Sequence, residues 1–329
     1  MRKRTIRIRF ARATCQESER VLSTPLLIDT DMGIDDAAAV CLALANEAVD
    51  VRAIVGVGGN VDLEQAVTNI DRLLTALNPP AMPVIGRGMD QVAEGLVDRR
   101  SVLGKDGFGE VDLAASGIPV VDFREAYREA IESAGGELTV LAIGPLTNVA
   151  TILRESPELA RSIRRIYVMG GAVLGKGNIA GVAEFNFHRD PVAAATVIGS
   201  GLDITVSPLE VTSHVSLDES NVAHLAASGY RTGEVLARLL AFPIEHDAGP
   251  QRGKFQLHDA VAAAGVLWPS LFMRTRMRLE ITTEGEHAGR SKPALGGDPN
   301  TQIDLLTAVN AGDLLENLLE SLCHEAFVV

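Results

Sequence analysis

The chain has 329 residues, which allows two average domains or one large α/β domain. Hydrophobic residues make up 47% of it, enough for a large core, and the formal net charge of −13 disfavours a nucleic-acid-binding surface. No apolar run is long enough for a transmembrane helix, so we expect no membrane as partner. The net negative charge likewise leads us to expect no nucleic acid as partner. The three widely spaced cysteines, Cys15, Cys41 and Cys323, favour a reducing compartment and predict a cytoplasmic protein.

Residues 1–24 are treated as an N-terminal extension that we expect to be disordered. The stretch 1–12 is rich in arginine but has no long apolar core, so it is a poor secretory signal. A transit peptide and a start codon placed too early remain open alternatives. Residues 25–329 show no repeat, low-complexity tract or linker, which predicts one domain.

Strand-like and helix-like runs alternate along the chain from residue 26 onward. The predicted strands are 26–30, 51–57, 84–86, 138–143, 166–169, 204–206 and 303–309. The predicted helices are 35–46, 63–77, 123–133, 191–198, 217–227, 233–242, 258–268 and 313–323. Residues 277–282 alternate and predict an antiparallel edge strand, whereas 88–119 is irregular and glycine-rich. This order predicts an α/β fold with a mostly parallel open sheet and helices on both faces, similar to the Rossmann arrangement.

Four carboxylates follow the first predicted strand within eight residues: Asp29, Asp31, Asp35 and Asp36. Open α/β sheets bind ligands at the carboxyl ends of their strands, which is where these acids fall. Carboxylates packed together without a neighbouring Lys or Arg repel one another, so a cation is expected among them. A hard divalent ion with oxygen ligands is the simple candidate.

Three other interpretations of the acidic run are possible. It could be an acidic turn that caps a helix. An EF-hand fits poorly, because its sixth position should be Gly and is Ile34, and its twelfth should be Glu and is Val40. A Mg²⁺-dependent phosphatase of the haloacid dehalogenase type fits better, with Asp29 as nucleophile, although no convincing downstream Lys and acidic pair is found.

Other polar residues also follow predicted strands. Asn60 follows the second strand, a Gly-Pro-Leu-Thr-Asn turn spans 144–148, and Glu184 and Asn186 follow the Met169-Gly170-Gly171 strand end. His258 and Asp259 open a late helix. Because the carboxyl ends of parallel strands share one rim, these residues can converge on one pocket.

The motifs resemble those of the nucleoside hydrolases, the inosine-uridine-preferring hydrolase family. The run Asp29-Thr30-Asp31-Met32-Gly33-Ile34-Asp35-Asp36 is similar to the family signature. Further matches follow in the family's order: Gly59-Asn60, Gly144-Pro145-Leu146-Thr147-Asn148, Met169-Gly170-Gly171, Asn178, Glu184-Phe185-Asn186 and His258-Asp259. The resemblance covers the chain from about Pro25 and implies hydrolysis of the N-glycosidic bond of ribonucleosides by a homodimer or homotetramer.

The resemblance also implies roles for individual residues. A Ca²⁺ ion would be held by Asp31, Asp36, Asp259 and a main-chain carbonyl, which we place at Ile143. Asp31 would be the general base for a Ca²⁺-bound water, and His258 would assist the leaving base. The substrate contacts would be Asp35 and Asn186 on ribose hydroxyls, Asn178 and Glu184 at the 5′ end, Phe185 near the sugar, and Asn60 in support of Asp35 and the water. A calcium-dependent nucleoside or ribose sensor without activity is the remaining alternative.

Two positions depart from the family pattern, and one pair of residues stands outside it. Leu103 occupies a position where many members have His, which leaves the base contacts and the base preference undetermined. Met32 stands where Pro is frequent, and we expect no consequence. His246-Asp247 is a second His-Asp pair, which we interpret as part of a lid or as solvent-exposed.

Overall fold

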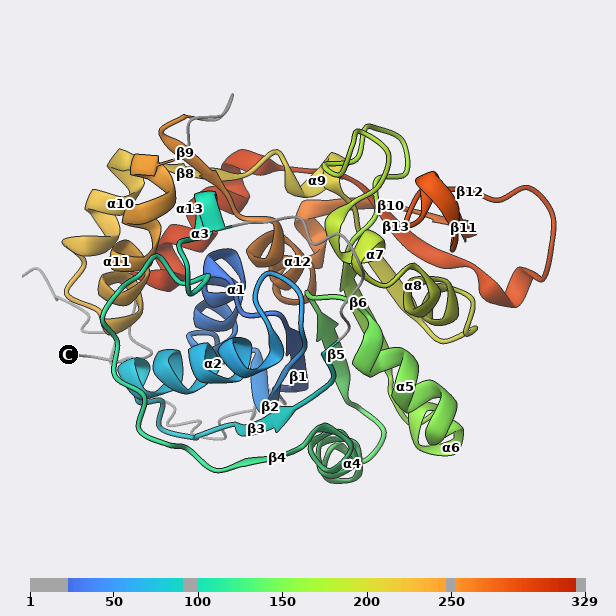
Figure 1. Cartoon of the computed structure of the whole chain (residues 1–329), viewed down its shortest axis with the longest axis horizontal. Coiled ribbons are helices and arrows are strands. Elements are labelled where there is room, and N and C mark those ends of the chain that lie inside the picture. The colour runs from blue at the N-terminus through green and yellow to red at the C-terminus, as the bar shows by residue number, and fades with distance from the viewer. Residues whose placement is uncertain (1–22, 91–99, 247–251, 324–329) are drawn as a thin grey trace, which may run out of the picture.

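The computed structural model describes residues 23–90, 100–246 and 252–323. Most of the expected extension, residues 1–22, therefore lies outside the described residues. A nine-stranded sheet runs through the molecule (Figure 1). Its strands in spatial order are β10 (Phe272–Met277), β13 (Ile303–Val309), β7 (Ile204–Ser207), β6 (Arg165–Met169), β5 (Thr139–Ala142), β1 (Thr24–Thr30), β2 (Val49–Gly56), β3 (Val84–Arg87) and β4 (Val120–Asp122).

Every neighbouring pair in this sheet is parallel except β10 and β13, which are antiparallel. The predicted mostly parallel α/β sheet is thereby confirmed. Chain order reverses at β1, since β2, β3 and β4 extend the sheet to one side and β5, β6 and β7 to the other. Such a switch point leaves a crevice at the carboxyl ends of the central strands, where α/β proteins bind ligands.

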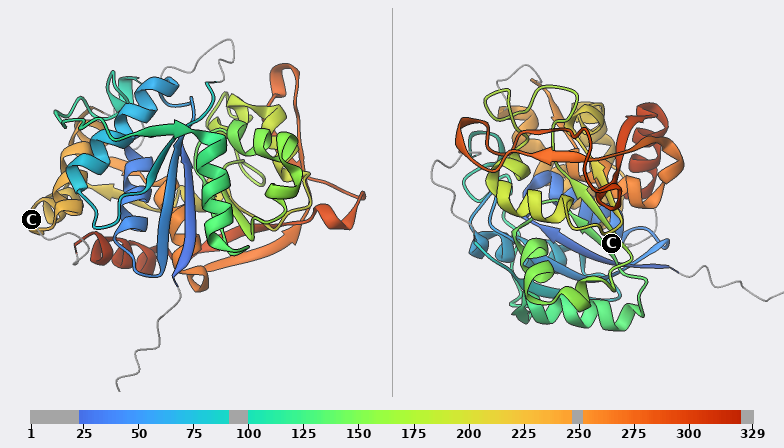
Figure 2. Two further views of the ribbon diagram at one scale, coloured as in Figure 1. Left: turned by 90° about the horizontal axis from the view of Figure 1, so that it is seen from below. Right: turned by 90° about the vertical axis from the view of Figure 1, so that its right-hand side faces the viewer.

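Alternate residues of the strands face two separate cores, which is why the central strands are apolar on both faces. In β1, Leu26 and Ile28 pack into the first core, whereas Leu27 packs into the second. The first core is covered by α1 (Ile34–Leu44), α2 (Leu63–Leu77), α3 (Arg100–Leu103), α9 (Leu209–Thr212), α10 (Glu219–Ala226), α11 (Arg231–His246), α12 (His258–Leu267) and α13 (Ala311–Leu322). The second is covered by α4 (Phe123–Ala134), α5 (Thr147–Glu155), α6 (Pro157–Ala160), α7 (Phe185–Arg189) and α8 (Pro191–Ile198). Figure 2 shows helices on both sides of the sheet.

Helix α2 shows why some sequence-predicted bounds hold to the residue. The Asp62 side chain accepts a hydrogen bond from the Gln65 backbone N–H at 2.8 Å and caps the first turn. Asn78 ends the helix in the left-handed region, with φ of 47°. Pro79 and Pro80 follow and cannot continue a helix.

The predicted edge strand at 277–282 is wrong. The antiparallel edge strand is β10, and the next strand, β11 (Leu279–Ile281), pairs instead with β12 (Ser291–Pro293) in a separate two-stranded sheet. In Figure 1 this small sheet lies at the end of the molecule opposite α10 and α11. Strand β10 was hidden because four of its six residues are exposed, so it carries no apolar alternation.

Short elements also differ from the prediction. The helix expected from residue 217 begins at Glu219, because Asp218 caps it through the N–H groups of Ser220 and Asn221. The preceding residues form β8 (Ser216–Asp218), which pairs with β9 (Lys254–Gln256). Three 3-10 turns complete the described structure, at Pro269–Leu271, Gly285–His287 and Pro299–Thr301. None of the described helices is both long and apolar enough to cross a membrane.

Candidate active site

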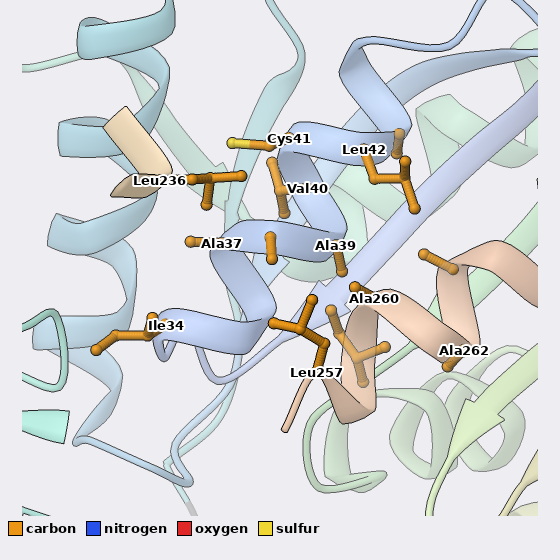
Figure 3. Packing of buried hydrophobic residues seen from close by; sticks show 14 of the residues in the cluster. Ile34, Ala37, Ala39, Val40, Cys41, Leu42, Leu236, Leu257, Ala260 and Ala262 are labelled. Atoms are coloured by element: carbon orange, nitrogen blue, oxygen red, sulfur yellow. The ribbon is translucent and has the colours of Figure 1, made fainter. Parts of the chain in front are cut away.

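The alanine-rich helices α1 and α12 pack against each other (Figure 3). Ala37 and Ala39 of α1 are fully buried, as are Ala260 and Ala262 of α12, and side chains this small allow the two backbones to approach closely. The first turn of α1 carries Asp35 and Asp36, and the first turn of α12 carries Asp259. The positive ends of both helix dipoles favour these carboxylates.

The packing brings three carboxylates together. One oxygen each from Asp35, Asp36 and Asp259 lies within 4.8 Å of the others, and all three residues are buried. Oxygens that bind one Ca²⁺ at about 2.3–2.6 Å can be at most about 5.2 Å apart, so this spacing fits such an ion. The group contains two of the predicted metal ligands, Asp36 and Asp259, with Asp35 as its third member in place of Asp31.

Asp31 lies beside this group and is held by Asn60. The Asn60 backbone N–H donates to Asp31 Oδ2 at 2.6 Å, and its side-chain Nδ2 donates to Asp31 Oδ1 at 3.1 Å and to Asp36 Oδ2 at 3.3 Å. Asp36 also accepts from the Thr30 hydroxyl at 2.5 Å and from the Gly33 N–H at 2.9 Å. Asn60 therefore orients Asp31 and Asp36, and its expected support of Asp35 and of the attacking water stays a prediction.

Asp31, Asp36 and Asp259 are destabilised in their charged forms. Burial, followed by the charge of Asp36, raises the pKa of Asp31 well above its usual range. Burial, followed by the charges of Asp35, Asp36 and Asp31, does the same to the pKa of Asp259. Burial also raises the pKa of Asp36, although the hydrogen bonds from Thr30 and Gly33 oppose it. A divalent cation would relieve this repulsion, so the donor set fits the expected metal.

Arg189 is a cation near the acids that no sequence motif marks, because it lies far from them along the chain. Arg189 ends α7, is buried, and places its guanidinium carbon 5.9 Å from the centre of the Phe185 ring. Burial lowers the pKa of Arg189, and the charges of Asp31 and Asp90 oppose that shift. The local signal is weak, since Arg189 lies three residues beyond the Glu184-Phe185-Asn186 motif.

The predicted carbonyl ligand and a predicted ribose contact are neighbours. Asn186 Nδ2 donates to the Ile143 carbonyl at 3.0 Å and to the Met169 carbonyl at 3.2 Å, which ties α7 to the ends of β5 and β6. Glu184 caps α7 by accepting from the N–H groups of Asn186 and Phe187 at 2.8 and 3.0 Å. It also accepts from the Gly171 N–H at 3.1 Å, so its carboxylate secures the local backbone.

His258 and Asn178 line one cavity of about 480 Å³, together with Leu209 and Glu210 of α9 and other residues of the 175–178 loop. His258 opens α12, and its Nδ1 lies 2.8 Å from the hydroxyl oxygen of Thr212. Asn178 is exposed on the loop. Thr212 was not anticipated, because it is separated from His258 by 46 positions and no local pattern marks it.

Asp29 does not take part in the acidic group. Its side chain is fully buried, accepts from the Tyr127 hydroxyl at 2.8 Å and from Asn148 Nδ2 at 3.1 Å, and has its pKa raised to about 7 by burial. A phosphatase nucleophile must be accessible to its substrate, whereas the carboxylate of Asp29 is fully buried and held by Tyr127 and Asn148. The phosphatase interpretation is therefore wrong.

Leu103 and Met32, the two departures from the family pattern, both lie in the first core. Leu103 is 1% exposed and packs there. Met32 has a φ of 44°, which the proline ring cannot adopt, and its N–H donates to the Thr30 hydroxyl. The backbone between Asp31 and Gly33 thus follows a path closed to proline, and the expectation that Met32 has no consequence for the function stays a prediction.

The second His-Asp pair is only partly described. His246 is exposed at the end of α11, with its ring stacked on Phe242 at 4.3 Å between centroids. Asp247 lies outside the described residues. The interpretation of this pair as lid or solvent-exposed stays a prediction.

Gly59 allows the backbone to approach Asp31 closely. A Cβ at this position would lie 2.1 Å from Asp31 Oδ2 and 2.6 Å from Asp31 Cβ. We expect Gly59→Ala to displace Asp31 and to lower kcat/KM by about 100-fold, the cost of a shift near 1 Å in an active site. Gly312→Ala is the control, because among the described residues its added Cβ would meet only Asn310 Oδ1, at 3.9 Å. Steady-state kinetics check both variants, and wild-type activity in Gly59→Ala would contradict the placement of Asp31.

A buried acidic site at the switch point of an open parallel sheet is typical of α/β proteins that bind a ligand there, and its oxygen donors suit a hard divalent cation. The sequence model described as inosine-uridine preferring nucleoside hydrolase matches residues 26–316. The chain is 34% identical over 274 residues to the pyrimidine-specific ribonucleoside hydrolase RihA of Escherichia coli (strain K12), a match that covers 81% of this chain and 86% of RihA. It superposes on the purine-preferring ribonucleoside hydrolase from Gardnerella vaginalis with a TM-score of 0.85 and 25% identity, over 92% of this chain and 99% of that one. An inosine-guanosine nucleoside hydrolase gives a TM-score of 0.80 at 26% identity, over 92% and 99% of the two chains.

The chain belongs to the inosine-uridine preferring nucleoside hydrolase family. It is a ribonucleoside hydrolase that cleaves the N-glycosidic bond, as the sequence motifs predicted. The inactive sensor is thereby set aside as an interpretation.

Proposed function

We propose that this enzyme works with Ca²⁺ held by Asp31, Asp36, Asp259 and the Ile143 carbonyl, with Asp31 as general base and His258 as the acid for the leaving base. The buried group of Asp35, Asp36 and Asp259, with oxygens within 4.8 Å, is the observation that carries the proposal. Three carboxylates buried together are costly unless a cation joins them. Calcium accepts six to eight oxygen ligands, which leaves positions for water and ribose hydroxyls beside the protein.

The roles follow from the chemistry of glycosidic cleavage. A bound Ca²⁺ would supply Lewis-acid activation of water and hold the ribose hydroxyls. Asp31 would take the proton of the attacking water, in the orientation given by Asn60. Positive charge develops on the ribose as the bond breaks, and a pocket rich in carboxylates favours it.

The remaining residues would hold the nucleoside. In this proposal Asp35 and Asn186 bind ribose hydroxyls, Asn178 and Glu184 hold the 5′ end, and Phe185 lies beside the sugar. Glu184, Phe185 and Asn186 start the same short helix, so the cap that holds α7 also places them. Release of ribose and free base from inosine and uridine, measured before and after removal of metal by a chelator, tests the proposal. Full activity in protein shown to contain no divalent ion would overturn it.

His258→Gln tests the acid. General acid catalysis contributes about 10²–10⁴-fold, so the variant should hydrolyse inosine slower by that factor. Nitrophenyl riboside has a leaving group that needs no proton, and its hydrolysis should change little. His246→Gln removes an exposed imidazole elsewhere and serves as the control. Equal losses on both substrates in His258→Gln would assign His258 a structural role.

For the base, we propose that pyrimidine ribonucleosides are the preferred substrates. The RihA relatives, at 34% identity, are described as pyrimidine-specific, whereas the purine-preferring neighbour shares 25%. A comparison of kcat/KM for uridine, cytidine, inosine and guanosine tests this. Higher values for both purine nucleosides would refute it.

We further propose a cytoplasmic homodimer or homotetramer. The spacing of the cysteines supports the cytoplasmic location, and the family resemblance supports the oligomeric state. Cys41 and Cys323 are free thiols in the structure, and Cys15 lies outside the described residues. Sedimentation equilibrium of the purified enzyme measures the oligomeric state.

A further inference from the structure

The short helix α9 contacts two parts of the wall of the cavity that His258 and Asn178 line. Thr212 at its end is fully buried, and its hydroxyl oxygen lies 2.8 Å from His258 Nδ1. Glu210, two residues earlier, accepts from the N–H groups of Leu174 and Gly175, where the loop toward Asn178 begins. One element thus contacts both His258 and the loop that carries Asn178.

The Thr212 hydroxyl is well placed to control the imidazole. The Thr212 backbone N–H donates to the Pro208 carbonyl at 3.0 Å, and a β-branched side chain has few χ1 choices in a helix. A buried hydroxyl in a fixed position restricts the rotation of the ring that it bonds. It also determines which ring nitrogen is engaged, since Nδ1 and Nε2 are not equivalent.

We propose that Thr212 is the positioning residue for His258. Its hydroxyl oxygen accepts the Nδ1–H, which keeps the proton on Nδ1 and assigns Nε2 to the leaving base. The inference rests on the proposed role of His258 as acid. It adds a residue that the family motifs in this sequence do not contain.

The proton balance follows from this arrangement. In this step His258 begins as the imidazolium, with Nδ1–H donated to Thr212 and a second proton on Nε2. As the bond between ribose and base breaks, the base leaves with the electron pair and takes the proton from Nε2. The oxygen of water forms the new bond to the sugar carbon, and its proton passes to Asp31. The imidazole ends neutral, with its remaining proton on Nδ1 and still donated to Thr212.

Thr212→Val tests the proposal, because it keeps the shape of the side chain and removes the hydroxyl. Loss of ring positioning should slow inosine hydrolysis by about 10- to 100-fold and leave nitrophenyl riboside hydrolysis within about twofold. Thr212→Ser should restore most of the inosine rate. Thr205→Val is the matched control, because the buried Thr205 hydroxyl makes no hydrogen bond within the described residues. If Thr212→Val proves too unstable to assay, Thr212→Ala removes the same hydroxyl without filling the space.

A double-mutant cycle with His258→Gln separates this inference from the proposed function. Thr212→Val should have no further effect on inosine once His258 is replaced. Losses that multiply in the double variant, or equal losses on both substrates, would show that Thr212 is merely structural. If His258→Gln slows inosine but Thr212→Val does not, the inference is overturned and the proposed function stands. If His258→Gln leaves inosine unaffected, the acid role fails and the inference fails with it.

Discussion

Asp259→Asn should remove the bound metal and the activity together. The substitution replaces one of three buried carboxylates whose oxygens lie within 4.8 Å of one another, and an amide binds a hard cation more weakly. Loss of partners that only orient metal ligands costs about 10- to 100-fold, so loss of a ligand itself should exceed 100-fold in kcat/KM. Metal analysis of the purified protein and the kinetics of uridine hydrolysis measure the two effects separately.

Asp71→Asn is the matched control, because Asp71 is also a buried carboxylate. It accepts hydrogen bonds from the N–H groups of Ser116 and Gly117, far along the chain from the acidic group. This variant should keep its metal and most of its activity. Asp36→Asn should behave as Asp259→Asn does. An active Asp259→Asn enzyme with unchanged metal content would refute the proposed site.

2′-Deoxyinosine should be a very poor substrate compared with inosine. Asp35 lies in the first turn of α1 within the acidic group, where it would bind a ribose hydroxyl beside the cation. Without that hydroxyl, a buried carboxylate loses its donor and the sugar loses its orientation. Sites built to bond a hydroxyl can reject the analogue without it by about 10⁴-fold. Much of the loss should appear in kcat, because the contact positions the reacting carbon against the attacking water.

The control for this discrimination is Asp35→Ala. Its activity on inosine should be low, and the ratio of kcat/KM for inosine over 2′-deoxyinosine should fall toward one. Intact protein with wild-type thermal stability would show that the fold survives the change. Hydrolysis of both nucleosides by the wild type at rates within a fewfold of each other would contradict ribose binding by Asp35.

Local sequence patterns predict the sheet, the bounds of α2 and the position of the first acidic residues. The alternation of apolar runs with helical periodicity predicted the parallel α/β sheet, because strands buried on both faces and amphipathic helices differ in residue spacing. The bounds of α2 were predicted to the residue, since its cap and its proline stop are both local. The acids after β1 could be placed on the ligand-binding rim, because chain order alone puts them at a carboxyl strand end.

Tertiary structure decided the features that depend on residues distant in sequence. Strand β10 is polar and mostly exposed, so only its pairing with β13 defines it. Arg189 reaches the acids because α7 packs at the ends of β5 and β6, and Thr212 meets His258 across 46 positions. The close packing of α1 on α12 brings Asp259 to Asp35 and Asp36. Which side chains meet across such distances is determined by helix packing and strand order, and neither leaves a local signal at the residues concerned.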